Sequence, residues 1–156
     1  MKKLLIIGIF VCGTYINLSA QANNVSLNAI GKYVEENGIL FNGNLETEYL
    51  SGTTECIYEI TDGVKDGKIS VFYENGLLKE TGSFNEGKKN GEWVSYNQDG
   101  KMASIAFYKN DVKHGTWKIC DDKGVVRSIQ QYNNGKRTGT WKSFDATGKL
   151  TESATY

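Results

Sequence analysis

The chain of 156 residues lacks proline altogether and has one histidine, His114, and three cysteines. Without proline, no residue loses its backbone N–H group, so the whole chain can take part in strand pairing. One histidine and no cluster of His and Cys at ligand spacing give no zinc-type metal site. General acid–base chemistry needs converging groups, which the sequence does not offer. We therefore expect a protein that is not an enzyme, with no catalytic, metal or cofactor-binding residue.

Net charge is also missing, since 18 basic residues balance 18 acidic ones. That balance does not favour nucleic acid as a partner. Long hydrophobic runs are absent as well, because the mostly apolar stretch from residue 4 to 15 is shorter than the roughly 20 residues that span a bilayer.

The first 22 residues resemble a cleaved signal peptide. Lys2 and Lys3 precede the apolar stretch, and Ala20-Gln21-Ala22 has the small-x-small pattern of a cleavage site. We expect cleavage near Ala20 or Ala22 and a periplasmic or secreted mature chain. Cys12 does not indicate a lipoprotein, since the lipid-attachment pattern of that family has a small residue before the cysteine and here Val11 precedes it.

Glycine is abundant, with 18 residues, and two sets of four recur at a spacing of 24. Self-similarity at a fixed period is the mark of a repeat array. Aromatic residues keep the same spacing, with a tryptophan two places after each later glycine of the first set. These repeat-defining residues are Gly67, Gly91, Gly115 and Gly139; Gly76, Gly100, Gly124 and Gly148; Trp93, Trp117 and Trp141; and Phe84, Tyr108 and Tyr132.

Each unit has the pattern of a β-hairpin. In the unit that runs from Gly91 to Tyr108, two stretches rich in aromatic and β-branched residues flank the turn that ends at Gly100. The turn glycine favours the left-handed backbone of a short hairpin loop. A second turn joins one unit to the next. The sequence therefore predicts an all-β fold, an elongated single-layer antiparallel meander of stacked hairpins.

The rings are expected to replace a thick core. Equivalent rings lie about two strand spacings apart, near 10 Å, and can pack through intervening side chains or over glycines. Trp93 and Tyr96 differ by three positions, which places them on opposite faces of a regular strand. Either both faces carry rings or a bulge realigns them.

Cys56 and Cys120 are the two cysteines that remain after cleavage. The repeat places them five strand spacings apart, roughly 24 Å, whereas a disulfide needs Cα atoms within about 7 Å. We expect two unpaired thiols, with Cys120 as a small hydrophobe in an aromatic slot. His114, in a turn between units, is expected to be a solvated turn residue.

The domain organisation follows from the register. Residues 1–22 form the signal peptide, residues 23–42 an irregular N-terminal capping segment, and residues 43–156 about five 24-residue repeats. The pattern Gly-x-Trp-x-x-Tyr-x-x-x-Gly, seen from Gly91 to Gly100, resembles the bacterial variant of the MORN repeat. Proteins of this type are often labelled YwqK-like antitoxin components. The resemblance implies a scaffold, a lipid contact or an appendage to an enzyme.

Basic residues also follow the 24-residue step in the loops between units. We expect them to line one long edge of the sheet, opposite an edge that carries Glu74, Asp99, Asp121, Asp122 and Asp145. One interpretation is a rim for an anionic partner, and the other is a set of copied charges that keep the sheet soluble. The residues of this candidate rim are Lys65, Lys88, Lys89, Lys113, Lys136 and Arg137.

The sequence thus favours an exported repeat module that binds a protein or an envelope component. Two alternatives stay open. One is an antitoxin or immunity-like protein that neutralises a toxin by direct binding, and the other is a peripheral protein on anionic membrane surfaces. A protein partner is expected, and its identity does not follow from the residues.

Overall fold

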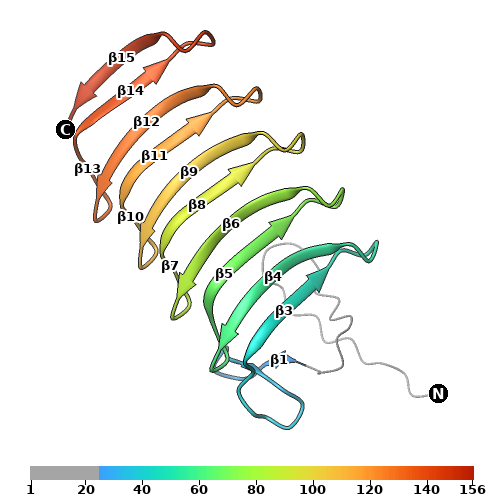
Figure 1. Cartoon of the computed structure of the whole chain (residues 1–156). Coiled ribbons are helices and arrows are strands. Elements are labelled where there is room, and N and C mark those ends of the chain that lie inside the picture. The colour runs from blue at the N-terminus through green and yellow to red at the C-terminus, as the bar shows by residue number, and fades with distance from the viewer. Residues whose placement is uncertain (1–24) are drawn as a thin grey trace.

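A computed structural model of the chain describes residues 25–156. The predicted signal peptide and its cleavage site lie outside these residues. Within the described residues, Figure 1 shows one long sheet of hairpins with no second layer packed on it, which confirms the predicted all-β meander. The sheet is antiparallel throughout, and its long strands follow the order β15-β14-β12-β11-β9-β8-β6-β5-β4-β3.

Five hairpins make up the sheet, and each joins a first strand to a second strand. They are β3 (Gly43–Glu48) with β4 (Thr54–Thr61), β5 (Val64–Phe72) with β6 (Leu78–Asn85), β8 (Gly91–Tyr96) with β9 (Met102–Lys109), β11 (Gly115–Cys120) with β12 (Val126–Asn133), and β14 (Thr140–Phe144) with β15 (Leu150–Thr155). Three two-residue strands extend the turns between hairpins: β7 (Lys88–Lys89), β10 (Val112–Lys113) and β13 (Lys136–Arg137).

The turn at the tip of each hairpin has the chemistry that the sequence predicted. Gly100 has a φ of 76°, and its N–H donates to the carbonyl of Asn97 at 2.9 Å. The Oδ1 atom of Asn97 accepts the N–H groups of Asp99 and Lys101, at 3.1 and 2.9 Å. Because the same glycine recurs at positive φ in every hairpin tip, the five tips are copies of one turn. These glycines are Gly52, Gly76, Gly100, Gly124 and Gly148.

The turns between hairpins have a different backbone conformation from the hairpin tips. Two consecutive residues with positive φ are the signature of the tight turn that matches strand twist. Glu86 and Gly87 form one such pair, with φ values of 48° and 81°. Asn110 and Asp111 form the next, at 51° and 67°, so a non-glycine residue fills both central positions there. The N–H of Asp111 donates to the carbonyl of Lys89 in the preceding unit at 2.9 Å, which ties adjacent units together.

A bulge recurs in every hairpin and bears on the alternative left open by the sequence. Ser95 pairs with Ser104, but Tyr96 pairs with Met102, so Ala103 is an extra residue in the second strand. The same shift occurs after Thr47, Val71, Ile119 and Ser143, 24 residues apart. The bulge therefore belongs to the repeat itself, but its extra residue lies in the second strand and not in the stretch from Trp93 to Tyr96.

The N-terminal segment packs on the first hairpin, and no strand of the described residues pairs with the outer edge of β3. Strands β1 (Ser26–Leu27) and β2 (Tyr33–Val34) pair with each other, and Val34 bridges Leu40 around a turn. Val25 and Phe41 pack with Leu45 of β3 and Ile60 of β4 in a buried cluster. The carbonyl of Phe41 accepts the N–H of Gly63 at 2.9 Å, as the carbonyl of Lys65 accepts that of Gly87 one unit later. The segment thus continues the register while covering the first hairpin.

Candidate binding surface

One face of the sheet carries a continuous row of rings, which we call the aromatic ladder. Rings from successive strands meet edge to face or tilted, with centroids 5.1 to 6.3 Å apart. Pairs at this separation stabilise a fold by about 0.5–1.5 kcal/mol each beyond their buried area. The prediction that equivalent rings pack through intervening side chains is confirmed, and the intervening side chains are themselves rings. The ladder consists of Phe84, Trp93, Tyr108, Trp117, Tyr132, Trp141 and Tyr156.

Trp93 is the most deeply buried ring, with 2 % of its surface exposed. It lies flat over Gly82, where a Cβ atom would run into the indole ring. The indole Nε1 of Trp93 is buried without a hydrogen-bond partner among the described residues. In the next unit, by contrast, Trp117 Nε1 donates to the carbonyl of Phe107 at 2.9 Å. Gly82 therefore allows the indole ring of Trp93 to lie close to the backbone, but the Nε1–H group of Trp93 does not make the hydrogen bond that Trp117 makes.

Four of the predicted rim residues lie over the ladder, each a unit apart. Lys89 Nζ is 3.7 Å from the ring centroid of Trp93 and 5.4 Å from that of Tyr108. Lys113 Nζ has the same relation to Trp117 and Tyr132, at 4.3 and 5.0 Å. A cation over an aromatic face contributes about 0.5–2 kcal/mol, more when it is desolvated. These cations are thus part of the ladder.

The first and last of the four cations differ in their surroundings. Lys65 Nζ lies 3.7 Å from the ring centroid of Tyr58, and burial lowers the pKa of this ammonium group. Arg137 is exposed, with Cζ 4.5 Å from the ring centroid of Trp141 and 5.2 Å from that of Tyr156. The other two predicted rim residues, Lys88 and Lys136, are exposed in β7 and β13.

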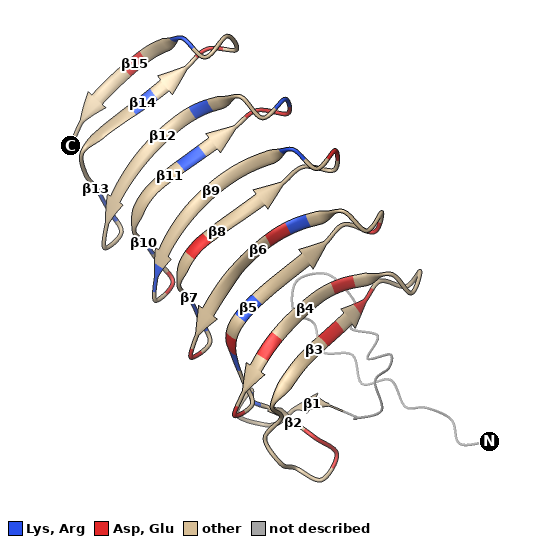
Figure 2. Ribbon diagram, in the orientation of Figure 1, with Lys and Arg blue, Asp and Glu red and all other residues tan. Residues whose placement is uncertain are grey.

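The predicted division into a basic edge and an acidic edge is wrong, because both edges carry both charges (Figure 2). Asp62, Glu86 and Asp111 share the turns of the basic residues, where each has a positive φ. The carboxylate of Asp111 accepts the N–H of Lys89 at 2.8 Å. Asp and Asn side chains suit such turns because they tolerate left-handed backbone and bond locally. Lys101 and Lys123 likewise stand in hairpin tips on the other edge.

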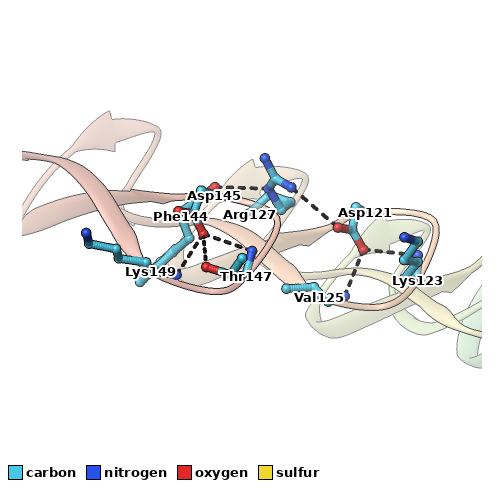
Figure 3. Close-up of polar contacts among 8 residues, drawn as sticks. All are labelled: Asp121, Lys123, Val125, Arg127, Phe144, Asp145, Thr147 and Lys149. Carbon is cyan, nitrogen blue, oxygen red and sulfur yellow. Dashed lines mark hydrogen bonds and ion pairs between the residues drawn. The ribbon is translucent and has the colours of Figure 1, made fainter.

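On that other edge, Arg127 connects two successive hairpin tips (Figure 3). Its Nε donates to the carbonyl of Phe144 at 2.9 Å, and its Nη1 lies 3.5 Å from the Asp121 carboxylate. Hydrogen bonds from the backbone N–H groups of Val125 and Lys123 lower the pKa of Asp121. Two of the five carboxylates predicted to form an acidic rim, those of Asp121 and Asp145, are thus engaged within their own turns.

His114 differs from its prediction as a solvated turn residue. Its side chain is half-buried, and its Nδ1 atom is buried without a partner among the described residues. Its backbone N–H donates to the Phe107 carbonyl at 2.9 Å, as that of Asn90 does to Ser83 one unit earlier. The ring is drawn against the sheet because its backbone is tied to the preceding hairpin.

The two thiols are unpaired, as predicted. Cys56 is buried beside Ile69, Trp93 and Ala106, and burial raises the pKa of its thiol to about 11. Cys120 is half-buried, and its thiol pKa is also raised, chiefly by burial. A raised pKa disfavours the thiolate, so neither cysteine has the environment of a nucleophile.

No group of three or more His, Cys, Asp and Glu side chains in residues 25–156 is placed to hold a metal ion. Nor does that part of the chain contain a helix long and apolar enough to cross a membrane. The arrangement offers a ringed, cation-covered face and two charged edges, which suit binding.

Comparison with known families decides the nature of the repeat. Three segments, residues 65–86, 89–110 and 137–156, match the MORN repeat variant. These three segments are MORN repeats. Each matched segment begins at a cation of the ladder, namely Lys65, Lys89 or Arg137. No curated protein matches the chain.

The MORN assignment covers the repeat and not a subfamily, and it gives no support for an antitoxin role. Modules of this kind typically act as binding scaffolds. Gly82, which seats Trp93, could not be found from the sequence pattern because it lies outside the 24-residue glycine register. The non-glycine turn residues with positive φ could have been found from the sequence, because they recur every 24 residues. They are Asp62, Glu86, Asn110 and Asn134.

Proposed function

We propose that this chain is an exported, non-enzymatic MORN module that binds an acidic protein surface of the cell envelope. The binding surface is the C-terminal part of the ladder, which we call the open ladder. It comprises Trp117, Tyr132, Trp141 and Tyr156 with the cations Lys113 and Arg137.

The observation that carries this proposal is the difference in burial between the two ends of the sheet. Trp93 is 2 % exposed, whereas Tyr156 at the far end is 53 % exposed. The buried hydrophobic residues of the described chain all lie between Val25 and Ala106. The N-terminal rings thus serve the core, and the C-terminal rings keep surface that a partner can cover.

The chemistry of the open ladder favours a protein with acidic and apolar groups. Trp, Tyr and Arg are the residue types enriched at the energetic centres of protein interfaces. Lys113 and Arg137 are both exposed while they lie over rings, so a carboxylate can approach them without displacing them. Export, which rests on the predicted signal peptide, places such a partner in the periplasm or outside the cell.

The test is affinity capture from the native envelope fraction with Lys113→Glu/Arg137→Glu as the binding variant. Its matched control is Lys101→Glu/Lys123→Glu, which makes the same charge change on the opposite edge. We expect the variant to lose the captured protein, with affinity lowered at least about 30-fold, and the control to retain it. Circular dichroism checks that both variants are folded. Equal capture by the variant and the control would contradict the proposal.

A liposome arm separates this proposal from the membrane alternative. Binding to anionic vesicles that Lys88→Glu/Lys136→Glu abolishes, with no protein captured, would favour peripheral attachment to lipid. If the captured protein is a toxin and the chain suppresses its activity, the antitoxin or immunity-like alternative is correct.

A further inference from the structure

The two terminal strands of the sheet, β15 and β3, are of complementary type. Along the array, each second strand is followed by the first strand of the next unit, as β6 is followed by β8 and β9 by β11. The sheet ends at one edge with β15, which is a second strand, and at the other with β3, which is a first strand. In the order of the array, a first strand such as β3 is therefore what would follow β15. The β3 edge of a second copy can take that place.

The register of such a contact follows from the array. Between units, Thr81 pairs with Val94, Ile105 with Lys118 and Ile129 with Lys142, always at the same 24-residue step. Continued beyond β15, this register places Ser153 opposite Glu46 of a second copy. Both residues are exposed and lie on the face opposite the ladder.

The N-terminal part of the array is acidic and the C-terminal part is basic, so the two parts of different copies attract each other. Residues 25–96 contain 12 acidic and six basic residues, whereas residues 97–156 contain six acidic and ten basic ones. Figure 2 shows acidic residues on β3 and β4 and basic residues on β11, β12 and β14. Pairing of two β15 edges brings positive ends together, and pairing of two β3 edges brings negative ends together. Pairing of β15 with β3 joins opposite charges.

Exposed apolar side chains also stand at both ends. Leu50, in the turn after β3, is 82 % exposed, while Leu150 in β15 and Tyr156 are 48 % and 53 % exposed. Tyr156 is the last ring of the ladder and has a ring neighbour, Trp141, on one side. A further strand would cover its other side.

We infer that copies of this chain associate head to tail, with β15 of one copy against β3 of the next. The contact is heterologous, so it propagates into an open chain of copies unless the rotation closes a ring. Because β15 is otherwise polar, with exposed Thr151, Glu152, Ser153 and Thr155, the contact is weak and depends on salt.

Cross-linking between two variants tests the inferred pairing. Residues directly opposite in neighbouring strands have Cβ atoms about 4.5–5.5 Å apart, near the range that a disulfide bridges. Glu46→Cys and Ser153→Cys chains, mixed and mildly oxidised, are expected to give a disulfide-linked dimer. Neither variant alone should give one above the background of the unaltered chain, which keeps Cys56 and Cys120.

Sedimentation velocity provides the second readout. The sedimentation coefficient of the unaltered chain should rise with concentration at low salt and fall back when salt is added. Lys142→Glu, beside the β15 edge, should weaken association at least tenfold, whereas Lys118→Glu, in the same slot one unit earlier, should leave it nearly unchanged. A dimer from Ser153→Cys alone or from Glu46→Cys alone would overturn the inference, as would a chain that stays monomeric at all concentrations without cross-linking in the mixture.

Discussion

The indole ring of Trp93 lies flat on Gly82, a residue of the neighbouring strand whose hydrogen atom leaves the space that the ring occupies. Trp93 is the central buried residue of a sheet that has one layer. The stability of this thin sheet therefore depends on how closely its rings approach the backbone.

Gly82→Ala should destabilise the protein by about 1–3 kcal/mol, the usual effect of overpacking a core. The new Cβ atom would run into the indole ring, and φ at this position is not in the left-handed region, so backbone strain contributes nothing. Urea unfolding of the variant and the unaltered chain measures the difference. An unchanged unfolding midpoint would mean that Trp93 does not rest on Gly82.

Gly100→Ala should cost about 1–2 kcal/mol for a different reason. Its φ is 76°, and no atom lies within 4 Å of the place that a Cβ atom would take, so the loss would come from backbone strain alone. Gly100→Asn is the matched control, because asparagine tolerates the left-handed region better and should lose less. Equal losses for alanine and asparagine would argue against a left-handed turn glycine.

Lys89→Met should reduce the free energy of unfolding by about 1 kcal/mol. Methionine keeps the aliphatic stem but removes the charge that lies 3.7 Å from the Trp93 ring centroid. Lys88→Met removes an equal charge at the adjacent exposed position and should change stability by less than about 0.5 kcal/mol. Chemical denaturation of the two variants side by side decides whether the cation belongs to the ladder.

Acid should destabilise the hairpin tips. Hydrogen bonds from the Thr147 hydroxyl and from the N–H groups of Lys149 and Thr147 lower the pKa of Asp145 in the folded state. The stability that this carboxylate provides is present above its unfolded pKa, near 3.9, and is lost as pH falls through the lower folded pKa. Asp145→Asn keeps the Oδ1 acceptor, so its melting temperature should decline less between pH 5 and pH 2. Parallel declines for the two proteins would contradict this.

Cys56 should resist thiol reagents in the folded protein. It is 3 % exposed, and burial raises its pKa to about 11, so both access and the thiolate fraction are low. Cys120 is half-buried and should react first. Mass spectrometry after timed labelling assigns the order, and faster labelling of Cys56 than of Cys120 would show that the buried cluster opens.

Much of the fold follows from the sequence because each unit repeats one local solution. The 24-residue step predicted the meander, the left-handed glycine at Gly100 and the separation of Cys56 from Cys120, since turn chemistry is local. It did not predict the seat of Trp93, because Gly82 belongs to a neighbouring unit and departs from the register.

The charges were less predictable than the turns. Spacing placed Lys89 at an edge, but its side chain lies over Trp93 because a ring face and an aliphatic stem offer more contact than water does. Spacing also suggested an acidic edge, yet Asp121 is held by the N–H groups of its own turn and by Arg127. Both outcomes depend on side-chain reach, which a pattern of residue types does not contain.

Hydrogen–deuterium exchange, measured strand by strand at a concentration and salt where the chain is monomeric, tests whether local stability falls along the ladder as the burial of its rings does. We expect the slowest exchange in β5, β6, β8 and β9, which surround Ile69 and Trp93, and progressively faster exchange towards β15. Exchange in β14 and β15 as slow as in β8 and β9 would contradict the division of the ladder into a buried N-terminal part and an exposed C-terminal part.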